Sequence, residues 1–170
     1  MAQQAHQEHR QQATDKVRCA VITVSDTRTS ETDSSGQFMQ QALTDAGHQI
    51  SAYSIVKDEP KDIRRLIQKY IQATDTDAVL LSGGTGLSPR DGTYEVVQAC
   101  LDKELTGFGE LFRFLSYEEI GAAAMMSRAT AGVANGTVII SMPGSSAAVR
   151  LAMEKLIVPE LAHMAHIARG

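Results

Sequence analysis

The chain is 170 residues long, and its 16 basic and 20 acidic residues give a formal net charge of −4. Its composition, 43% hydrophobic and 21% charged, is typical of a globular protein and excludes a fully disordered chain, a collagen-like repeat and a disulfide scaffold. The acidic balance argues against a general nucleic-acid-binding protein. No apolar run approaches the roughly 20 residues that span a membrane, so we expect no membrane association.

The first 16 residues differ in character from the rest of the chain. They contain five glutamines and no large aliphatic side chain beyond Met1, so burial cannot offset the entropy of ordering them. We therefore predict a mobile tail over residues 1–16 and a single α/β domain over residues 17–170. The tail lacks the apolar segment of a secretory signal, and two cysteines fit buried thiols, so we predict a cytoplasmic protein.

From Val17 onward, apolar strands alternate with segments of helical spacing. Strands are expected at residues 17–24, 49–56, 77–81 and 137–142, where β-branched and other apolar residues run together. Helices are expected at residues 38–46, 60–71, 93–103 and 108–120, with one or two more at the end of the chain, interrupted at Pro159. Ser34 and Gln37 have the spacing of a capping box for the first helix. Residues 121–134 carry too little periodicity to assign.

This alternation predicts βαβ units and a largely parallel sheet. The strands are nearly continuous apolar runs, as in sheets that helices cover on both faces. Ligands of open α/β sheets bind beyond the carboxyl ends of the strands. We therefore expect the loops that begin at Ser25, Lys57, Ser82 and Pro143 to share one rim and to form one composite site.

The loop after the third expected strand, residues 82–91, has the sequence SGGTGLSPRD. Three glycines in four positions let the backbone approach a ligand and turn N–H groups toward an anion. The loop lacks both the lysine of a Walker loop and the G-x-G-x-x-G spacing of a dinucleotide site, and a tight strand-to-helix turn is the alternative. The phosphate-binding candidates here are Gly83, Gly84, Thr85, Gly86 and Arg90.

Two further segments are candidates for contacts with an anion. Pro143, Gly144 and Ser145 precede an alanine-rich helical start, where free N–H groups attract phosphate, although simple helix capping explains the serine equally well. Ser127 and Arg128 lie in the unassigned stretch, where the arginine either reaches an anion or ends a helix.

Asp58 and Asp91 each stand where a rim loop meets a helix. Either one alone is explained as a helix cap. Together, beside a phosphate-type loop, they suit Mg²⁺ held between carboxylates and phosphates. Asp26 is a third candidate, next to Ser25 at the end of the first strand.

Several motifs occur in order along residues 17–160. They are Thr23–Thr27, Val56–Glu59, Ser82–Gly86 with Arg90 and Asp91, Gly107–Glu110, Ser127 with Arg128, Ala131–Val133 and Met142–Ser145. This ordered set resembles the MogA/MoaB family of molybdenum cofactor biosynthesis proteins, the molybdopterin adenylyltransferase type, and the stretch from Phe112 to Gly121 is most similar to its bacterial MoaB branch.

The resemblance implies a three-layer α/β domain that assembles as a homotrimer or a homohexamer. It implies transfer of AMP from ATP to the terminal phosphate of molybdopterin, with Asp58 and Asp91 as the catalytic, magnesium-linked pair. The glycine-rich and Pro-Gly loops would bind phosphates, with Ser25 and Asp26 among the substrate contacts. Other molybdenum cofactor biosynthesis proteins are implied as partners.

Two alternatives remain at the level of sequence. One is a non-catalytic molybdopterin-binding or scaffold protein of the same pathway. The other is a nucleotide-dependent oxidoreductase, against which the missing G-x-G-x-x-G fingerprint argues.

Overall fold

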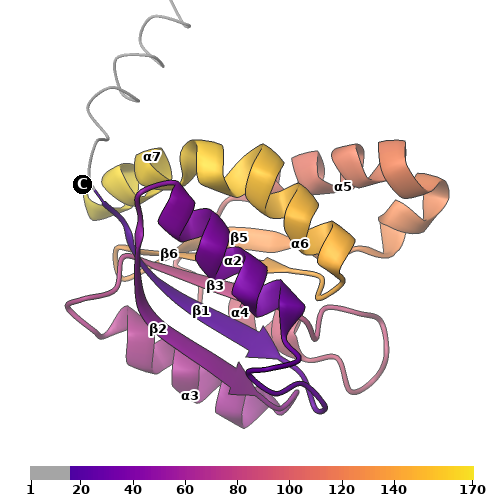
Figure 1. The fold of residues 1–170 in the computed structure, drawn as a ribbon, viewed down its shortest axis with the longest axis horizontal. Helices are drawn as coiled ribbons and strands as arrows, with labels where there is room; N and C mark the ends of the chain where they lie inside the picture. The colour runs from indigo at the N-terminus through magenta and orange to yellow at the C-terminus, as the bar shows by residue number, and fades with distance from the viewer. Residues whose placement is uncertain (1–15) are drawn as a thin grey trace, which may run out of the picture.

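The computed structural model describes residues 16–170, and the predicted tail lies outside them except for Lys16. The predicted strands are all present, with ends that differ by a few residues at most. In chain order the elements are β1 (Arg18–Val24), α2 (Ser34–Asp45), β2 (Gln49–Val56), α3 (Pro60–Ile71), β3 (Ala78–Ser82), α4 (Thr93–Gln98), β4 (Lys103–Glu104), α5 (Thr106–Ile120), a 3₁₀ helix (Gly121–Met126), β5 (Thr130–Ala134), β6 (Thr137–Met142), α6 (Ser146–Ala152), a π-helical turn (Met153–Ile157) and α7 (Val158–Arg169) (Figure 1).

The sheet has six strands in the order β2-β1-β3-β6-β5-β4. The first four of these run parallel, with Val21 of β1 opposite Tyr53 of β2 and Leu80 of β3. The last two strands, β5 and β4, are antiparallel to their neighbours. The structure thus confirms a mixed, mostly parallel sheet.

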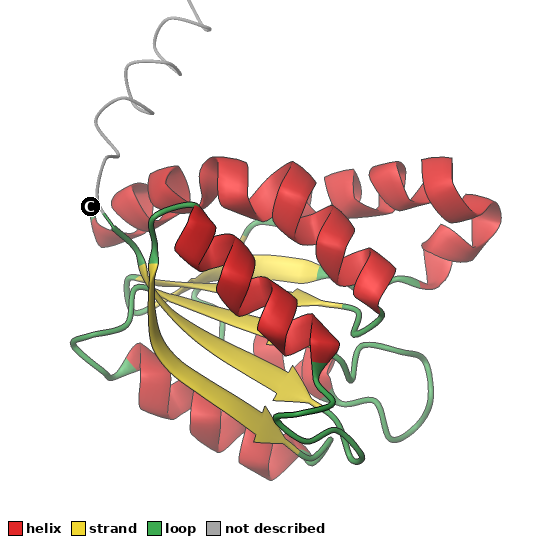
Figure 2. Ribbon diagram, viewed as in Figure 1, coloured by secondary structure: helices red, strands yellow, loops and turns green. Residues whose placement is uncertain are grey.

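Helices cover both faces of this sheet and make three layers (Figure 2). Alternate residues of β1 point to opposite faces, as the pleat of a strand requires. Cys19 and Val21 join a core cluster beneath α2, α5, α6 and α7. Ala20 and Ile22 join a second cluster beneath α3 and α4. The sheet is therefore fixed between two apolar cores, which leaves its strand ends to form the rim.

Two of the expected helical details are wrong. The helix expected at residues 93–103 ends at Gln98, because Lys103 and Glu104 pair with β5 as a short strand and this tertiary pairing overrides the local pattern. The expected capping box is absent as well. Asp33, one residue earlier than Ser34, is the N-cap of α2, and its carboxylate accepts a hydrogen bond from the Gly36 N–H at 3.0 Å.

Pro159 does not end a helix, and the expected interruption lies just before it. The helical backbone runs from α6 through a π-helical turn directly into α7, and Pro159 follows that turn. A proline within a helix lacks an N–H donor and its ring crowds the carbonyl four residues earlier, which here lies in the π-helical turn. The unassigned residues 121–134 form the 3₁₀ helix and β5.

The thiol of Cys19 is fully buried in β1, and burial raises its pKa to about 12. It is a core residue without the thiolate character that a reactive cysteine needs. None of the helices formed by residues 16–170 combines the length and apolar character that crossing a membrane requires.

Candidate functional site

The predicted rim exists, because four neighbouring parallel strands end at the same edge of the sheet. Hydrogen bonds tie their loops to one another. The Ser25 N–H donates to the Val56 carbonyl at 2.8 Å, and the Gly83 N–H donates to the Met142 carbonyl at 3.0 Å. The loops after β1, β2, β3 and β6 therefore form one continuous surface.

The glycine-rich loop can be built only with glycine at its key positions. Gly83 and Gly84 have positive φ angles of 99° and 65°, a region that L side chains avoid. A Cβ atom at position 84 would lie 2.1 Å from Oγ1 of Thr93 and 2.7 Å from Oδ2 of Asp58. A Cβ atom at position 86 would lie 2.6 Å from Oδ2 of Asp91. The loop thus lies directly against both candidate carboxylates.

The N–H groups of this loop are available to a ligand. Those of Gly84, Thr85 and Gly86 have no hydrogen-bond acceptor among residues 16–170. Consecutive free N–H groups in a turn with positive φ angles form an anion-binding nest. These free N–H groups are the ones on which the predicted phosphate-binding role of the loop depends.

Asp58 is nearly buried between two rim loops. Its Oδ1 accepts a hydrogen bond from the Gly92 N–H at 3.3 Å, and its own N–H donates to Oδ1 of Asp26. Burial raises the pKa of the Asp58 carboxyl above its ordinary value, and the negative charges of Asp91 and Asp26 add to the rise, against the Gly92 hydrogen bond. Such crowding of carboxylates is typical of a functional site.

Asp91 stabilises the turn at residues 88–91, which ends the glycine-rich loop. Its Oδ2 accepts a hydrogen bond from the Ser88 N–H at 2.9 Å, and its backbone N–H donates to the Ser88 carbonyl. Neither aspartate is a helix cap. The N-cap of α3 is Glu59 and that of α4 is Gly92, so the capping explanation is wrong for both.

Arg90 and Asp26 belong to the same cluster. Nε of Arg90 forms an ion pair with Oδ2 of Asp26 at 2.9 Å, and its Nη2 donates to Glu59 at 3.3 Å. Ser25 lies next to them, and its hydroxyl oxygen accepts hydrogen bonds from the N–H groups of Thr27 and Arg28. These bonds shape the loop after β1 and leave the O–H of Ser25 to donate to a ligand.

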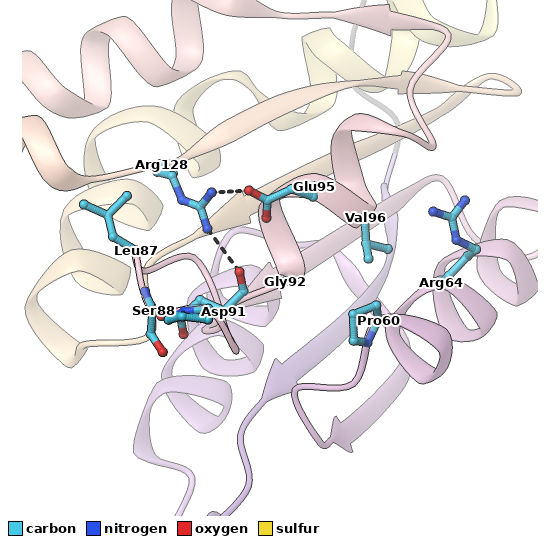
Figure 3. A pocket seen from close by; sticks show the side chains of 10 residues that line it. Pro60, Arg64, Leu87, Ser88, Asp91, Gly92, Glu95, Val96 and Arg128 are labelled. Atoms are coloured by element: carbon cyan, nitrogen blue, oxygen red, sulfur yellow. Dashed lines mark hydrogen bonds and ion pairs between the residues drawn. The ribbon is translucent and has the colours of Figure 1, made fainter.

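Arg128 holds the glycine-rich loop from the other side. Its guanidinium donates to the carbonyls of Thr85 and Gly86 and to that of Asp91 at 3.2 Å. It also forms an ion pair with Glu95, as Figure 3 shows. From the sequence, Arg128 is expected either to reach an anion or to end a helix. In the structure its guanidinium is already bound to protein acceptors, and it holds the glycine-rich loop in place.

Two hollows lie on either side of this loop. The Asp91 pocket, about 450 Å³ in volume, has the lining shown in Figure 3. The glycine-loop pocket, about 300 Å³, is formed by Gly84–Gly86, Pro143–Ser145 and Ser127, together with apolar side chains that include Phe112, Ile120 and Met126. Leu87 and Arg128 line the first, and their chain neighbours Gly86 and Ser127 line the second. One loop thus separates two ligand-sized spaces.

The Pro-Gly loop is packed against the glycine-rich loop. A Cβ atom at position 144 would lie 3.0 Å from the Cα atom of Gly83. Ser145 is the N-cap of α6, and its Oγ accepts a hydrogen bond from the Ala148 N–H, so the capping explanation of this serine is correct. Ser127 lines the same pocket, and its buried Oγ has no hydrogen-bond partner among the described residues.

Sequence reasoning missed several residues of this site. The buried hydroxyl of Thr93 faces Gly84 and has no hydrogen-bond partner within residues 16–170. Phe112, Ile120 and Met126 give the glycine-loop pocket an apolar wall. The signal for Thr93 is its position two residues after Asp91, whereas the apolar wall has no local signal because it depends on how α5 packs.

The two aspartates do not form a complete metal site by themselves. Among residues 16–170, no group of three or more His, Cys, Asp or Glu side chains is arranged to hold a metal ion. Mg²⁺ usually takes one or two protein carboxylates and completes its shell with water and substrate phosphates. The crowded pair Asp58 and Asp91, beside a phosphate-type loop, fits that mode of binding.

Comparison with known proteins gives consistent similarities. Residues 20–163 match a family model described as a probable molybdopterin binding domain. The chain is 60% identical over 159 residues to molybdenum cofactor biosynthesis protein B of Bacillus subtilis strain 168, covering 93% of this chain and 94% of that protein.

Solved structures agree with the sequence relatives. A molybdenum cofactor biosynthesis protein B superposes with a TM-score of 0.88 at 52% identity, over 91% of this chain and 96% of that chain. The tungsten cofactor synthesizing protein MoaB from Pyrococcus furiosus superposes with a TM-score of 0.83 at 36% identity, over 92% and 99%. These structures confirm the three-layer fold.

Proposed function

Because this chain belongs to the molybdopterin-binding domain family of molybdenum cofactor biosynthesis proteins, we propose that it transfers AMP from ATP to the terminal phosphate of molybdopterin. The observation that carries the proposal is the pair of pockets on either side of one glycine-rich loop. A transferase with two substrates needs two spaces close to the reacting groups. Here Asp91 lines one pocket, and Gly86, which lies against the Asp91 carboxylate, lines the other.

The walls of the glycine-loop pocket suit a ligand with a flat ring and a phosphate. Phe112, Ile120 and Met126 offer apolar surface on one side. On the other side lie the free N–H groups of Gly84 to Gly86. Pockets that combine an apolar wall with a few placed polar groups are typical of small-molecule sites.

The proposed reaction breaks one bond and forms another. An oxygen of the molybdopterin phosphate attacks the α-phosphorus of ATP, the bond from that phosphorus to the β-phosphate oxygen breaks, and pyrophosphate leaves with the electron pair. No protein nucleophile takes part. The N–H groups of the glycine-rich loop stabilise phosphate oxygens as charge shifts during the transfer.

Asp58 and Asp91 are the residues that we propose to hold Mg²⁺. When bound, the cation offsets negative charge on the phosphates. The support lies in the raised pKa of Asp58, because burial and the neighbouring carboxylates disfavour its charge and a cation would relieve that penalty. Arg90, paired with Asp26 and Glu59 at the same place, keeps part of this charge balanced.

The proposal is tested with purified protein, ATP, magnesium and molybdopterin. We expect release of pyrophosphate and formation of an adenylylated pterin, with neither product when molybdopterin is omitted. If the protein binds molybdopterin but releases no pyrophosphate, the adenylyl transfer is wrong and a binding or scaffold role in the same pathway takes its place.

We further propose that the chain assembles with copies of itself. Helix α5 and the 3₁₀ helix after it expose large apolar side chains, and a monomer seldom leaves so many together in water. Sedimentation at micromolar concentration should show an assembly several times the 18.3 kDa of one chain, as expected for the predicted trimer or hexamer. A monomer would contradict it. The side chains are Leu111, Phe114, Tyr117, Ile120, Met125 and Met126.

A further inference from the structure

The connection between β1 and α2 contains a charged network that ends on the Pro-Gly loop. Nη1 of Arg28 forms an ion pair with Oδ1 of Asp33 at 3.0 Å, and its Nη2 donates to the carbonyl of Gly144 at 3.2 Å. The hydroxyl of Ser35, in the first turn of α2, donates to the same carbonyl at 3.1 Å. One donor from the connection and one from the first turn of α2 thus hold the same carbonyl oxygen.

Asp33 holds this network in place. Its side chain is fully buried, and it also accepts hydrogen bonds from the Tyr53 hydroxyl at 2.7 Å and from the Gly36 N–H at 3.0 Å. Burial raises the pKa of the Asp33 carboxyl, but the surrounding donors outweigh burial and keep the pKa below its ordinary value. Asp33 is therefore a charged anchor for Arg28, and neither residue lines the glycine-loop pocket.

The orientation of the Gly144 carbonyl determines where the next N–H group points. In a trans peptide the carbonyl of Gly144 and the N–H of Ser145 point in opposite directions. The structure contains no cis peptide bond within its described residues. Because Arg28 and Ser35 hold the carbonyl, the Ser145 N–H is directed away from them. It has no acceptor among residues 16–170, and Ser145 lines the glycine-loop pocket.

Because position 144 is a glycine, the orientation of its carbonyl depends on the hydrogen bonds from Arg28 and Ser35. The close approach of Gly83 leaves little room for a side chain there, but glycine adopts many backbone conformations at little cost. Without its two donors, the peptide could rotate and present a carbonyl oxygen to the pocket. A carbonyl oxygen repels phosphate, whereas a free backbone N–H group can donate a hydrogen bond to it.

We propose that Arg28 and Ser35, anchored by Asp33, are positioning residues that aim the Ser145 N–H at a phosphate group in the glycine-loop pocket. The identity of the ligand rests on the proposed function, whereas the test below does not depend on that function. Arg28, Ser35 and Asp33 act through the Gly144 carbonyl and touch no substrate.

The test measures binding of inorganic pyrophosphate to the full chain by calorimetry, with magnesium chloride held constant. Arg28→Met should weaken binding by about tenfold, since a hydrogen bond from a charged donor is lost. Ser35→Ala, which changes no charge, should weaken it by about threefold. The control Arg65→Met removes an equal charge from an exposed ion pair on α3 and should bind like the parent protein.

Ser35→Ala separates positioning from a general effect of positive charge. If only the charge of Arg28 matters, Ser35→Ala binds like the parent and the inference is overturned. It is also overturned if both variants, melting within a few degrees of the parent, bind pyrophosphate within about twofold of it, or if the parent binds none. Crystals of Arg28→Met should show the Gly144 carbonyl rotated, and an unchanged carbonyl would contradict the proposal.

Failure of this inference and failure of the proposed function give different results. A parent protein that binds pyrophosphate through Ser145 but transfers no AMP contradicts the adenylyl transfer and leaves the positioning role intact. A parent that transfers AMP while Arg28→Met and Ser35→Ala bind pyrophosphate normally contradicts only the positioning role.

Discussion

Replacing Asp58 or Asp91 with asparagine is expected to lower the rate of pyrophosphate release by about 10²–10³-fold, the usual cost of one lost electrostatic contact in a transition state. Asparagine keeps the size of the side chain. Its oxygen can still accept the hydrogen bond from Gly92 or Ser88 that the aspartate accepts now. The change therefore removes charge and leaves the loops in place. The measurement is steady-state pyrophosphate release at saturating ATP, magnesium and molybdopterin.

The matched control is Asp45→Asn, which removes an equal charge at the end of α2, where the carboxylate accepts a hydrogen bond from Gln41. That variant should keep the parent rate. If Asp58→Asn and Asp91→Asn both release pyrophosphate at near-parent rates, the proposed metal role is wrong.

The stability of Asp58→Asn gives an independent check on the same residue. A carboxyl whose pKa is raised by folding weakens the folded state at neutral pH, where its charge is present. Asparagine removes that charge, so the variant should melt at or above the parent temperature near pH 7. The difference should vanish as the pH falls and the parent Asp58 becomes protonated. A residue kept at a cost in stability is expected where function requires its charge.

Replacing Gly84 with alanine is expected to lower the free energy of unfolding by about 3 kcal/mol and to abolish adenylyl transfer. A positive φ costs an alanine about 1–2 kcal/mol, and overpacking of a filled site adds about 1–3 kcal/mol. The added methyl group would overlap Thr93 and the carboxylate of Asp58. Chemical denaturation measures the first effect and pyrophosphate release the second.

Gly47→Ala is the control for the backbone contribution. Gly47 also has a positive φ, 85°, but a Cβ atom there would meet nothing within 4 Å. It should cost only the backbone strain, about 1 kcal/mol, and should leave activity unchanged. Equal losses for the two variants would show that the loop does not press on the carboxylates.

Sequence reasoning found the rim because its signals are local. Each parallel strand is a run of apolar residues, and the polar or glycine-rich residues after it stand next to it in the chain. The loops at Ser25, Asp58, Gly83 and Gly144 could therefore be placed together by topology alone. The roles of single side chains could not be predicted in this way, because each role depends on which residue from another segment contacts the side chain.

Arg128 illustrates the part that could not be predicted. It precedes β5, and only because β5 runs antiparallel to β6 does the beginning of that strand reach the rim. Residues 121–134 are small and carry no periodicity that would reveal the strand or its direction. Asp33 presents a similar case, since the choice between it and Ser34 as helix cap depends on Arg28 and Tyr53, which contact it from other segments.

The position of β6 in the sheet has a consequence for synthesis of the chain. β6 is the last strand in the sequence, yet it lies between β3 and β5 in the sheet. Until residues 137–142 leave the ribosome, the sheet exists as two separate parts, each with an unpaired edge that invites pairing with other chains. We therefore expect a nascent chain that stops before β6 to depend on chaperones. Refolding should be slow and cooperative, because the central pairing joins segments far apart in sequence.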